Sequence, residues 1–330
     1  PAEDPDGDAI ADYHFQLADR PDMAWPLSSN FEKLVSNTAD RGKARYRLPY
    51  PGLLTPGVTY YWRVRAKDAQ GVWGPWGATW SFTAGGPAPP ADVRLEPVPG
   101  DSTRVVLRWK PGPGGEKPVK YRVYGSDEKG FTVSDEAYVV NVGASDLPRK
   151  FAANFAAETA GTELVVLGPG LDVPNANRAF YRVVAVGGAG KRGGPSDYAA
   201  APRPFVTTRP PDRATVGAAY KGSLATVRSL GDLRTYQSGQ KSVSRFWEVE
   251  TPHFALVQGP SWLRLDEKTG AITGTPDAEG AADVMVKVTL ERTVRKLDDS
   301  RLSWGHELVK EVGTDAVGSV THRFRITVGR

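Results

Sequence analysis

The sequence predicts an all-β fold made of three β-sandwiches in tandem. Tyr60, Trp62 and Val64 alternate with residues of a largely cationic second face, and this period of two is typical of a half-buried strand. A similar stretch returns at 180–186, and an internal repeat indicates an array of like domains. The chain of 330 residues also contains 36 Gly and 27 Pro, which favours many short strands joined by turns.

The length allows two or three domains of ordinary size. We predict boundaries at residues 1–86, 87–208 and 209–330. The first boundary falls in Gly85–Pro90, a segment rich in proline and therefore semi-rigid.

In the first domain the pattern predicts strands at Ile10–Leu17, Ala44–Leu48, Tyr60–Lys67 and Thr79–Thr83. Within the earliest of these, alternation places His14 on the polar face, so we expect a solvent-facing side chain there.

Residues 60–82 resemble the last two strands of a fibronectin type III domain. In that family two strands precede the one that Ile10–Leu17 resembles. The second domain has both, at 91–95 and 105–109, but nothing before Ile10 can supply them. The first sandwich is therefore expected to lack its first two strands, which would lie upstream in the same polypeptide or come from a partner chain.

Two tryptophans and two arginines are the candidate binding residues of the first domain. Trp73, Trp76 and Trp80 lie near the arginines in the sequence, and such rings, above all those of Trp73 and Trp76, could form an exposed platform for the sugar rings of a polysaccharide. Alternatively, Arg63 and Arg65, which share the outward face of a strand, could stack on them through cation–π contacts. Such an Arg–Trp ladder is similar to the one that cytokine receptors carry in related domains, and it is the favoured hypothesis.

The acidic start of the chain is a candidate metal site. Asp4, Asp6 and Asp8 alternate around Gly7, and clustered carboxylates are the ligands that calcium prefers. The pattern departs from the EF-hand loop, so a polar turn entering a strand is the favoured alternative.

The second domain contains a long insertion at 126–177. We expect a strand at Tyr138–Val142 and one or two helical turns at Phe151–Ala157. Long loops with structure of their own often carry function, but packing against a neighbouring domain is an equal alternative.

The third domain contains the most specific local signature. Residues 258–276 include a Pro-Ser-Trp-Leu entry, an Asp-Glu-Lys-Thr-Gly turn and a Gly-Thr-Pro exit. They resemble the cadherin-like, immunoglobulin-type domains of bacteria. Trp262 and Leu265 are expected to anchor the core, and Gly270 to permit the turn.

Two insertions distinguish this domain from the family that it resembles. They cover 228–250 and 295–318, and we expect the second to be part of an extended hairpin with closing strands at 284–290 and 324–328.

Two strings with a catalytic appearance do not meet the requirements of their motifs. Gly188–Gly193 matches GxGxxG, but the following Gly-Pro-Ser-Asp is a turn, whereas a dinucleotide site needs a helix there. His306–Lys310 begins like HExxH, but Lys310 stands where the second zinc ligand should be.

Composition excludes further classes. There is no Cys, so disulfides, zinc–thiolate sites and cysteine nucleophiles are absent. The net charge of +4 arises from 42 basic and 38 acidic residues without a basic stripe, which argues against nucleic-acid binding. No apolar run is long enough to span a membrane. The four His residues occupy no recognisable catalytic constellation, so we expect no enzyme.

The resemblances imply a non-catalytic, extracytoplasmic structural, spacer or docking module in a larger bacterial secreted or surface protein. The alternative is a carbohydrate- or protein-binding module, accessory to a polysaccharide-active enzyme, that uses the tryptophans or the inserted loops.

Overall fold

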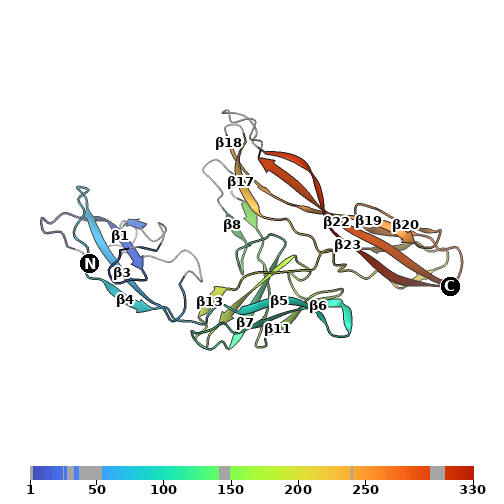
Figure 1. Cartoon of the computed structure of the whole chain (residues 1–330), viewed down its shortest axis with the longest axis horizontal. Helices are drawn as coiled ribbons and strands as arrows, with labels where there is room; N and C mark the ends of the chain where they lie inside the picture. Colours follow the sequence, from blue (N-terminus) through green and yellow to red (C-terminus); the bar gives the residue numbers. More distant parts are fainter. Residues whose placement is uncertain are drawn as a thin grey trace. The chain divides into compact units, whose positions relative to one another are not determined.

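A computed structural model describes residues 3–24, 26–27, 33–36, 54–140, 149–238, 241–297 and 309–330. The regular elements of these residues are all β-strands, which confirms the predicted fold class (Figure 1). The chain divides into two compact units, and each is described by itself. The first unit comprises Pro1–Pro90, Pro111–Lys120 and Val184–Pro195; the second comprises Ala91–Lys110, Tyr121–Val183 and Ser196–Arg330. The three predicted domain ranges stay a prediction.

The first domain forms one four-stranded antiparallel sheet of order β2-β1-β3-β4. Its strands are β1 (Ile10–Ala18), β2 (Lys33–Ser36), β3 (Thr59–Asp68) and β4 (Trp80–Thr83). The three corresponding predicted strands are confirmed, whereas the one predicted at 44–48 lies outside the described residues. Leu17, Tyr60 and Ala84 form a small buried cluster on one face.

The second sandwich consists of two sheets. A three-stranded sheet has the order β11-β6-β5, and a second sheet has the order β10-β7-β12-β13, with β14 also paired to β12. The strands are β5 (Ala91–Val98), β6 (Asp101–Lys110), β7 (Lys120–Ser126), β10 (Phe155–Thr159), β11 (Glu163–Leu167), β12 (Phe180–Val186), β13 (Arg192–Pro195) and β14 (Ala199–Ala200). Both strands predicted to precede β7 are confirmed.

The long insertion adds a short pair of strands, β8 (Tyr138–Val140) and β9 (Arg149–Phe151). The helical turns expected at 151–157 are wrong, because residue 151 ends β9 and residues 155–157 begin β10, which pairs with β7. There Ala156 is buried, with 3% of its surface exposed, while the Phe155 ring lies 5.8 Å from that of Tyr124.

The glycine-rich string at 188–193 is the loop of a hairpin, as predicted. It joins β12 to β13, and the N–H of Gly190 donates to the carbonyl of Gly187. No helix follows it, so the dinucleotide motif fails. Residues 306–308 of the other rejected string lie outside the described residues.

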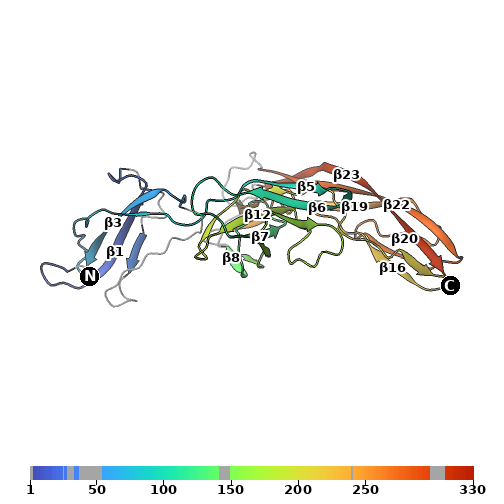
Figure 2. The ribbon, with the colours of Figure 1, turned by 90° about the horizontal axis from the view of Figure 1, so that it is seen from below.

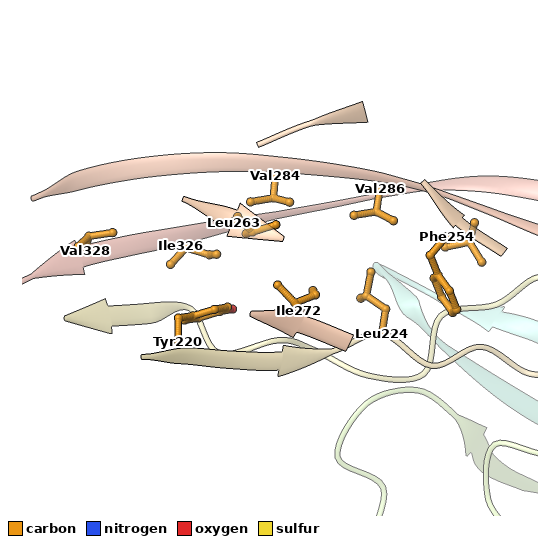
Figure 3. Close-up of a cluster of buried hydrophobic side chains, with 10 residues drawn as sticks. Tyr220, Leu224, Phe254, Leu263, Ile272, Val284, Val286, Ile326 and Val328 are labelled. Carbon is orange, nitrogen blue, oxygen red and sulfur yellow. The ribbon is translucent and has the colours of Figure 1, made fainter. Parts of the chain in front are cut away.

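The third domain packs two sheets face to face (Figures 2 and 3). Their orders are β15-β23-β22-β19 and β16-β21-β20. The strands are β15 (Arg213–Thr215), β16 (Tyr220–Ser223), β19 (Glu250–Gln258), β20 (Leu263–Leu265), β21 (Ala271–Gly274), β22 (Gly280–Leu297) and β23 (Val309–Gly329). Alternate apolar residues of β22 and β23 meet those of β16 and β21 in the core, including Val284, Val286, Ile272 and Ile326.

The turn signature of this domain folds for a clear physical reason. The carboxylate of Asp266 accepts hydrogen bonds from the N–H groups of Lys268 and Thr269, at 3.0 and 2.8 Å. Gly270 has a φ of +71°, and a Cβ there would lie 2.3 Å from a backbone carbonyl oxygen. The core anchor expected at Leu265 is only partly buried, whereas Leu263 is 2% exposed.

Both insertions of the third domain are hairpins in the described residues. The first contains β17 (Leu233–Ser238) and β18 (Lys241–Phe246). The second lengthens the β22–β23 hairpin, whose pairing continues to Leu297 and Val309. The extended hairpin is confirmed, and Trp304 and His306 lie outside the described residues.

Candidate functional site

The candidate residues of the first domain lie on β3 and on the loop that follows it, residues 69–79. This loop folds back along β3, because the N–H groups of Gly74 and Gly77 each donate to a β3 carbonyl at 2.9 Å. A Cβ at Gly77 would lie 3.2 Å from the carbonyl oxygen that it approaches, so a glycine allows the close contact. The loop thereby brings Trp73 and Trp76 to the outward face of β3. The expectation that Trp80 joins them is wrong, because Trp80 begins β4 and pairs with Trp62.

Cations and indole rings contact one another in succession on this face. The guanidinium carbon of Arg63 lies 4.5 Å from the ring centroid of Trp76. That of Arg65 lies 4.6 Å from Trp76 and 4.8 Å from Trp73, and the Lys67 ammonium lies 5.5 Å from Trp73. The geometry is that of an Arg–Trp ladder.

Strand β1 contributes two members that the sequence analysis did not assign to the ladder. Gln16 accepts a hydrogen bond from Arg63 at 2.8 Å. His14 Nδ1 lies 3.2 and 3.3 Å from two nitrogens of Arg65, and its ring lies 5.0 Å from Trp76. Because a guanidinium only donates, Nδ1 must accept. His14 thus lies on the outward face of the strand, as alternation predicted, but its side chain is half-buried in the ladder instead of pointing freely into solvent.

This arrangement restricts what the surface can bind. A sugar platform needs a free ring face, whereas Trp73 and Trp76 are each contacted by two cationic side chains. Cation–π contacts contribute about 0.5–1 kcal/mol each at exposed sites. The ladder therefore holds the loop on the sheet, and whether these residues also bind a ligand stays a prediction.

The acidic start of the chain forms a turn. The Asp4 carboxylate accepts hydrogen bonds from the N–H groups of Asp6 and Asp8, at 2.9 and 3.4 Å. In the part of the chain that the structure describes, no group of three or more His, Asp or Glu side chains is arranged to hold a metal ion. Calcium binding by these three residues stays a prediction.

In the second unit, the insertion of the second domain meets the first insertion of the third. The carbonyl of Asp127 accepts a hydrogen bond from the N–H of Leu230 at 2.7 Å. The N–H of Lys129 in turn donates to the carbonyl of Gly231 at 3.0 Å. Sequence periodicity could not reveal this junction, because it is made by backbone groups of two segments about a hundred residues apart.

A buried ion pair lies beside this junction. Glu250 accepts hydrogen bonds from Arg203 Nε at 3.0 Å and from the N–H of Ser229 at 2.7 Å. The side chains of Glu250 and Arg203 are 4% and 19% exposed. The Arg203 guanidinium also lies 5.1 Å from the Phe180 ring. The residues that follow the second sandwich are thus fixed to the first insertion of the third domain.

One carboxyl at the junction has a shifted pKa. Burial, with a smaller contribution from nearby Asp232, raises the pKa of Glu128 to about 7. The Asp232 carboxylate has Lys129 and Arg234 within 3.9 and 3.7 Å. Because the pKa of Glu128 is raised in the folded state, its protonation bears on the stability of this region.

A cleft of about 420 Å³ also lies in the second unit. Its lining includes Thr103, Phe205, Arg209 and His322. Burial, followed by the charge of Arg209, lowers the pKa of the His322 imidazole. Mixed apolar and polar groups line the cleft, without a pair of acid and base groups that would indicate catalysis.

In the described residues no helix is long and apolar enough to cross a membrane. No protein-family model and no curated protein sequence matches the chain.

The solved structures that are similar to the chain include the following two. One is Bacteroides ovatus SGBP-B, from a mixed-linkage glucan utilization locus, in complex with a mixed-linkage heptasaccharide. It is 14% identical to this chain, with a TM-score of 0.18, and the match covers 98% of this chain. This chain spans only 62% of the length of the SGBP-B chain. The other comprises the FN1–FN3 domains of chicken CNTN1, with 12% identity and a TM-score of 0.19 over 97% of this chain and 90% of that one. Similarity at this level carries no functional inference, and the all-β sandwich fold rests on the sheets described above.

Proposed function

We propose that this chain is a non-catalytic structural module of a larger extracytoplasmic bacterial protein, which spaces, orients or docks other parts of that protein. The proposal includes the family assignment: two fibronectin type III-like sandwiches followed by a bacterial cadherin-like, immunoglobulin-type domain. A module of this kind acts through geometry, because a rigid connection fixes the separation of its ends.

The observation that carries the proposal is the junction in the second unit. Backbone hydrogen bonds join Asp127 to Leu230 and Lys129 to Gly231, and Glu250 binds Arg203 beside them. Domains joined only by a linker move relative to one another by default. Here each segment that meets at the junction is an insertion, so the contact adds to the two sandwiches a connection that neither needs for its own core.

The test is a distance measurement between the second and third domains. Because the chain has no Cys, Lys110→Cys and Lys287→Cys can be labelled specifically with nitroxides, and both positions are exposed. We expect a single narrow distance distribution by pulsed electron spin resonance. A broad distribution would show a free hinge and would contradict the spacer function.

The alternative function, polysaccharide binding through Trp73 and Trp76, has a separate test. Electrophoresis in gels that contain soluble β-glucan, xylan or starch measures retardation by each polymer. We expect no retardation, because cationic side chains contact both rings. Retardation that disappears in Trp73→Ala would reverse the order of the two hypotheses.

A further inference from the structure

The cleft of the second unit is lined by basic side chains. Its volume of about 420 Å³ lies in the range of small-molecule sites. The described residues that line it include Arg209, His322 and Arg323, but no Asp or Glu. A second hollow, of about 430 Å³, shares Arg209 with this cleft and adds Lys221, again with no acidic residue in its described lining. We call the first of the two hollows the basic cleft.

The two arginines of the basic cleft are not neutralised by the protein. Both are exposed, and neither Arg209 nor Arg323 forms a hydrogen bond or an ion pair in the described part of the chain. Arg325, two residues further along β23, shows the contrast, because it binds Asp283 through two nitrogens at 2.7 and 3.0 Å. A planar guanidinium group binds a carboxylate through two parallel hydrogen bonds. The basic cleft therefore offers two guanidinium groups to an anionic ligand.

The acidic residue beside the basic cleft is already held by its neighbours. The Asp101 carboxylate accepts hydrogen bonds from the hydroxyl and the N–H of Thr103, at 2.6 and 2.9 Å, and lies 3.8 Å from Arg104. The hydrogen bonds from Thr103, followed by the charges of Arg104 and Arg209, lower the pKa of Asp101. Arg209 thus acts on Asp101 through its charge alone, without a contact that would occupy its guanidinium group.

The basic cleft is short along β23, where residues 320–324 line it. The segment that follows the second sandwich contacts β23 on either side of these residues. The N–H of Thr327 donates to the carbonyl of Asp212 at 2.8 Å, and a Cβ at Gly318 would lie 3.2 Å from the carbonyl oxygen of Arg203. These two contacts close the cleft at both ends along the strand, so it fits a short ligand better than a peptide that passes through it.

The other groups of the lining match a sugar ring. The hydroxyls of Ser102 and Thr321 belong to exposed residues and form no hydrogen bond within the described residues. A hydroxyl both donates and accepts hydrogen bonds, as the hydroxyls of a sugar do. The half-buried rings of His322 and Phe324 lie 5.8 Å apart, and Phe205 belongs to the same lining. Such rings offer an apolar surface to one face of a sugar, while a few polar groups orient it.

We propose that the basic cleft binds a short acidic saccharide, with the carboxylate of a uronic acid held by Arg209 and Arg323 and the sugar ring against Phe324. A neutral sugar would gain nothing from the two arginines. The site lies outside the tryptophan ladder and outside the three insertions, so it is independent of the spacer function and of the polysaccharide platform considered above.

The test measures the binding of small acidic sugars to the 330-residue chain by isothermal titration calorimetry. The probes are digalacturonate and the β-1,4-linked disaccharide of glucuronic acid, and the matched controls are their methyl esters, which keep the rings and lose the charge. We expect at least one acid to bind and its ester to bind many-fold more weakly. The proposal is overturned if neither acid binds or if the esters bind equally well. Tighter binding of diglutamate or of a sulfated disaccharide would overturn it in favour of a peptide or a sulfate ester.

Substitutions of arginine locate the site. Arg209→Gln and Arg323→Gln should each weaken the binding of the acid about tenfold or more, because a hydrogen bond to a charged group is lost. Arg213→Gln is the matched control, since Arg213 is an exposed arginine of β15 that does not line the cleft. This variant should bind as the unsubstituted chain does. Equal affinity in all three variants would place binding elsewhere and refute the proposal.

A second measurement needs no change at the arginines. In the unsubstituted chain, the acid should shift the imidazole NMR signals of His322, which are assigned by their loss in His322→Gln. The signals of His253 should stay in place, because its side chain lies on β19, 47% exposed and outside the lining of the cleft. Binding that leaves the His322 signals unmoved, or that moves those of His253 equally, would contradict the assigned site.

Discussion

The buried ion pair at the junction gives the sharpest prediction, for Glu250→Gln. The substitution keeps the size of the side chain and removes its charge. Both oxygens of Glu250 accept hydrogen bonds, from Arg203 Nε and from the Ser229 N–H. An amide offers one oxygen and one NH₂ group, so one of the two donors must face another donor.

The expected cost follows from this geometry. A hydrogen bond to a charged group contributes about 1.5–3 kcal/mol, and breaking a buried ion pair by changing one partner costs about 3–5 kcal/mol. Because Gln retains one of the two acceptors, we expect Glu250→Gln to lower the free energy of unfolding by about 3 kcal/mol, near the lower end of that range. Urea denaturation followed by circular dichroism measures this loss as a lower midpoint at an unchanged m-value.

The matched control is an exposed ion pair in the same unit. Arg325 binds Asp283 through two nitrogens at 2.7 and 3.0 Å, and the two side chains are 65% and 61% exposed. Exposed pairs contribute about 0–1 kcal/mol, so Asp283→Asn should lie in that range. If Glu250→Gln costs no more than Asp283→Asn, burial does not determine the strength of the junction and the argument is refuted.

Three further predictions concern single positions. Trp76→Ala should destabilise the first domain by about 2–3 kcal/mol, because a half-buried ring and two cation–π contacts are lost. Trp80→Ala in the 330-residue chain should cost clearly less. If calorimetry shows a smaller loss for Trp76→Ala than for Trp80→Ala, the ladder is contradicted. The pKa of Glu128 is raised from 4.5 to about 7 in the folded state, so as pH rises the unfolded state loses this proton at a lower pH than the folded state does. Stability is therefore lost as pH rises from about 4.5 to 7. Glu128→Gln should remove that decline in denaturation midpoints measured at several pH values, and an unchanged decline would refute the assignment. Left-handed backbone strain alone costs roughly 1–2 kcal/mol. Gly270→Ala should cost several times as much in urea denaturation, since its Cβ would lie 2.3 Å from a carbonyl oxygen, whereas Gly217→Ala should cost only the strain, because Gly217 has a similar φ of +75° and nothing within 4 Å. Equal losses of stability in the two variants would contradict the crowding at Gly270.

The ladder illustrates what a period of two can establish. Alternation along β3 was enough to place Arg63 and Arg65 on one face, which made stacking of nearby tryptophans on them a hypothesis. It could not assign His14 and Gln16 to the same cluster, because their positions depend on the pairing of β1 with β3. The hydrogen bond between Arg65 and His14 spans 51 residues, and no local pattern encodes that register.

The error at 151–157 has a different cause. Alanine favours helix in isolation, so a seven-residue segment with four alanines and two phenylalanines suggested helical turns. In the structure Phe155 and Ala156 belong to a strand paired with β7. Pairing with a neighbouring strand overrides local preference, and that neighbour lies about thirty residues earlier in the chain.

The junction between the two insertions argues for a particular kind of rigidity. An apolar contact between two loops would tolerate sliding, because the hydrophobic effect has no direction. The contact at Asp127, Leu230 and Gly231 is instead made of backbone hydrogen bonds, whose donors and acceptors must align. Beside it, Glu250 must keep both of its partners or remain buried without one. Sliding by one residue would break these bonds together, so the junction selects one arrangement of its segments, and selection of one arrangement is what a spacer requires.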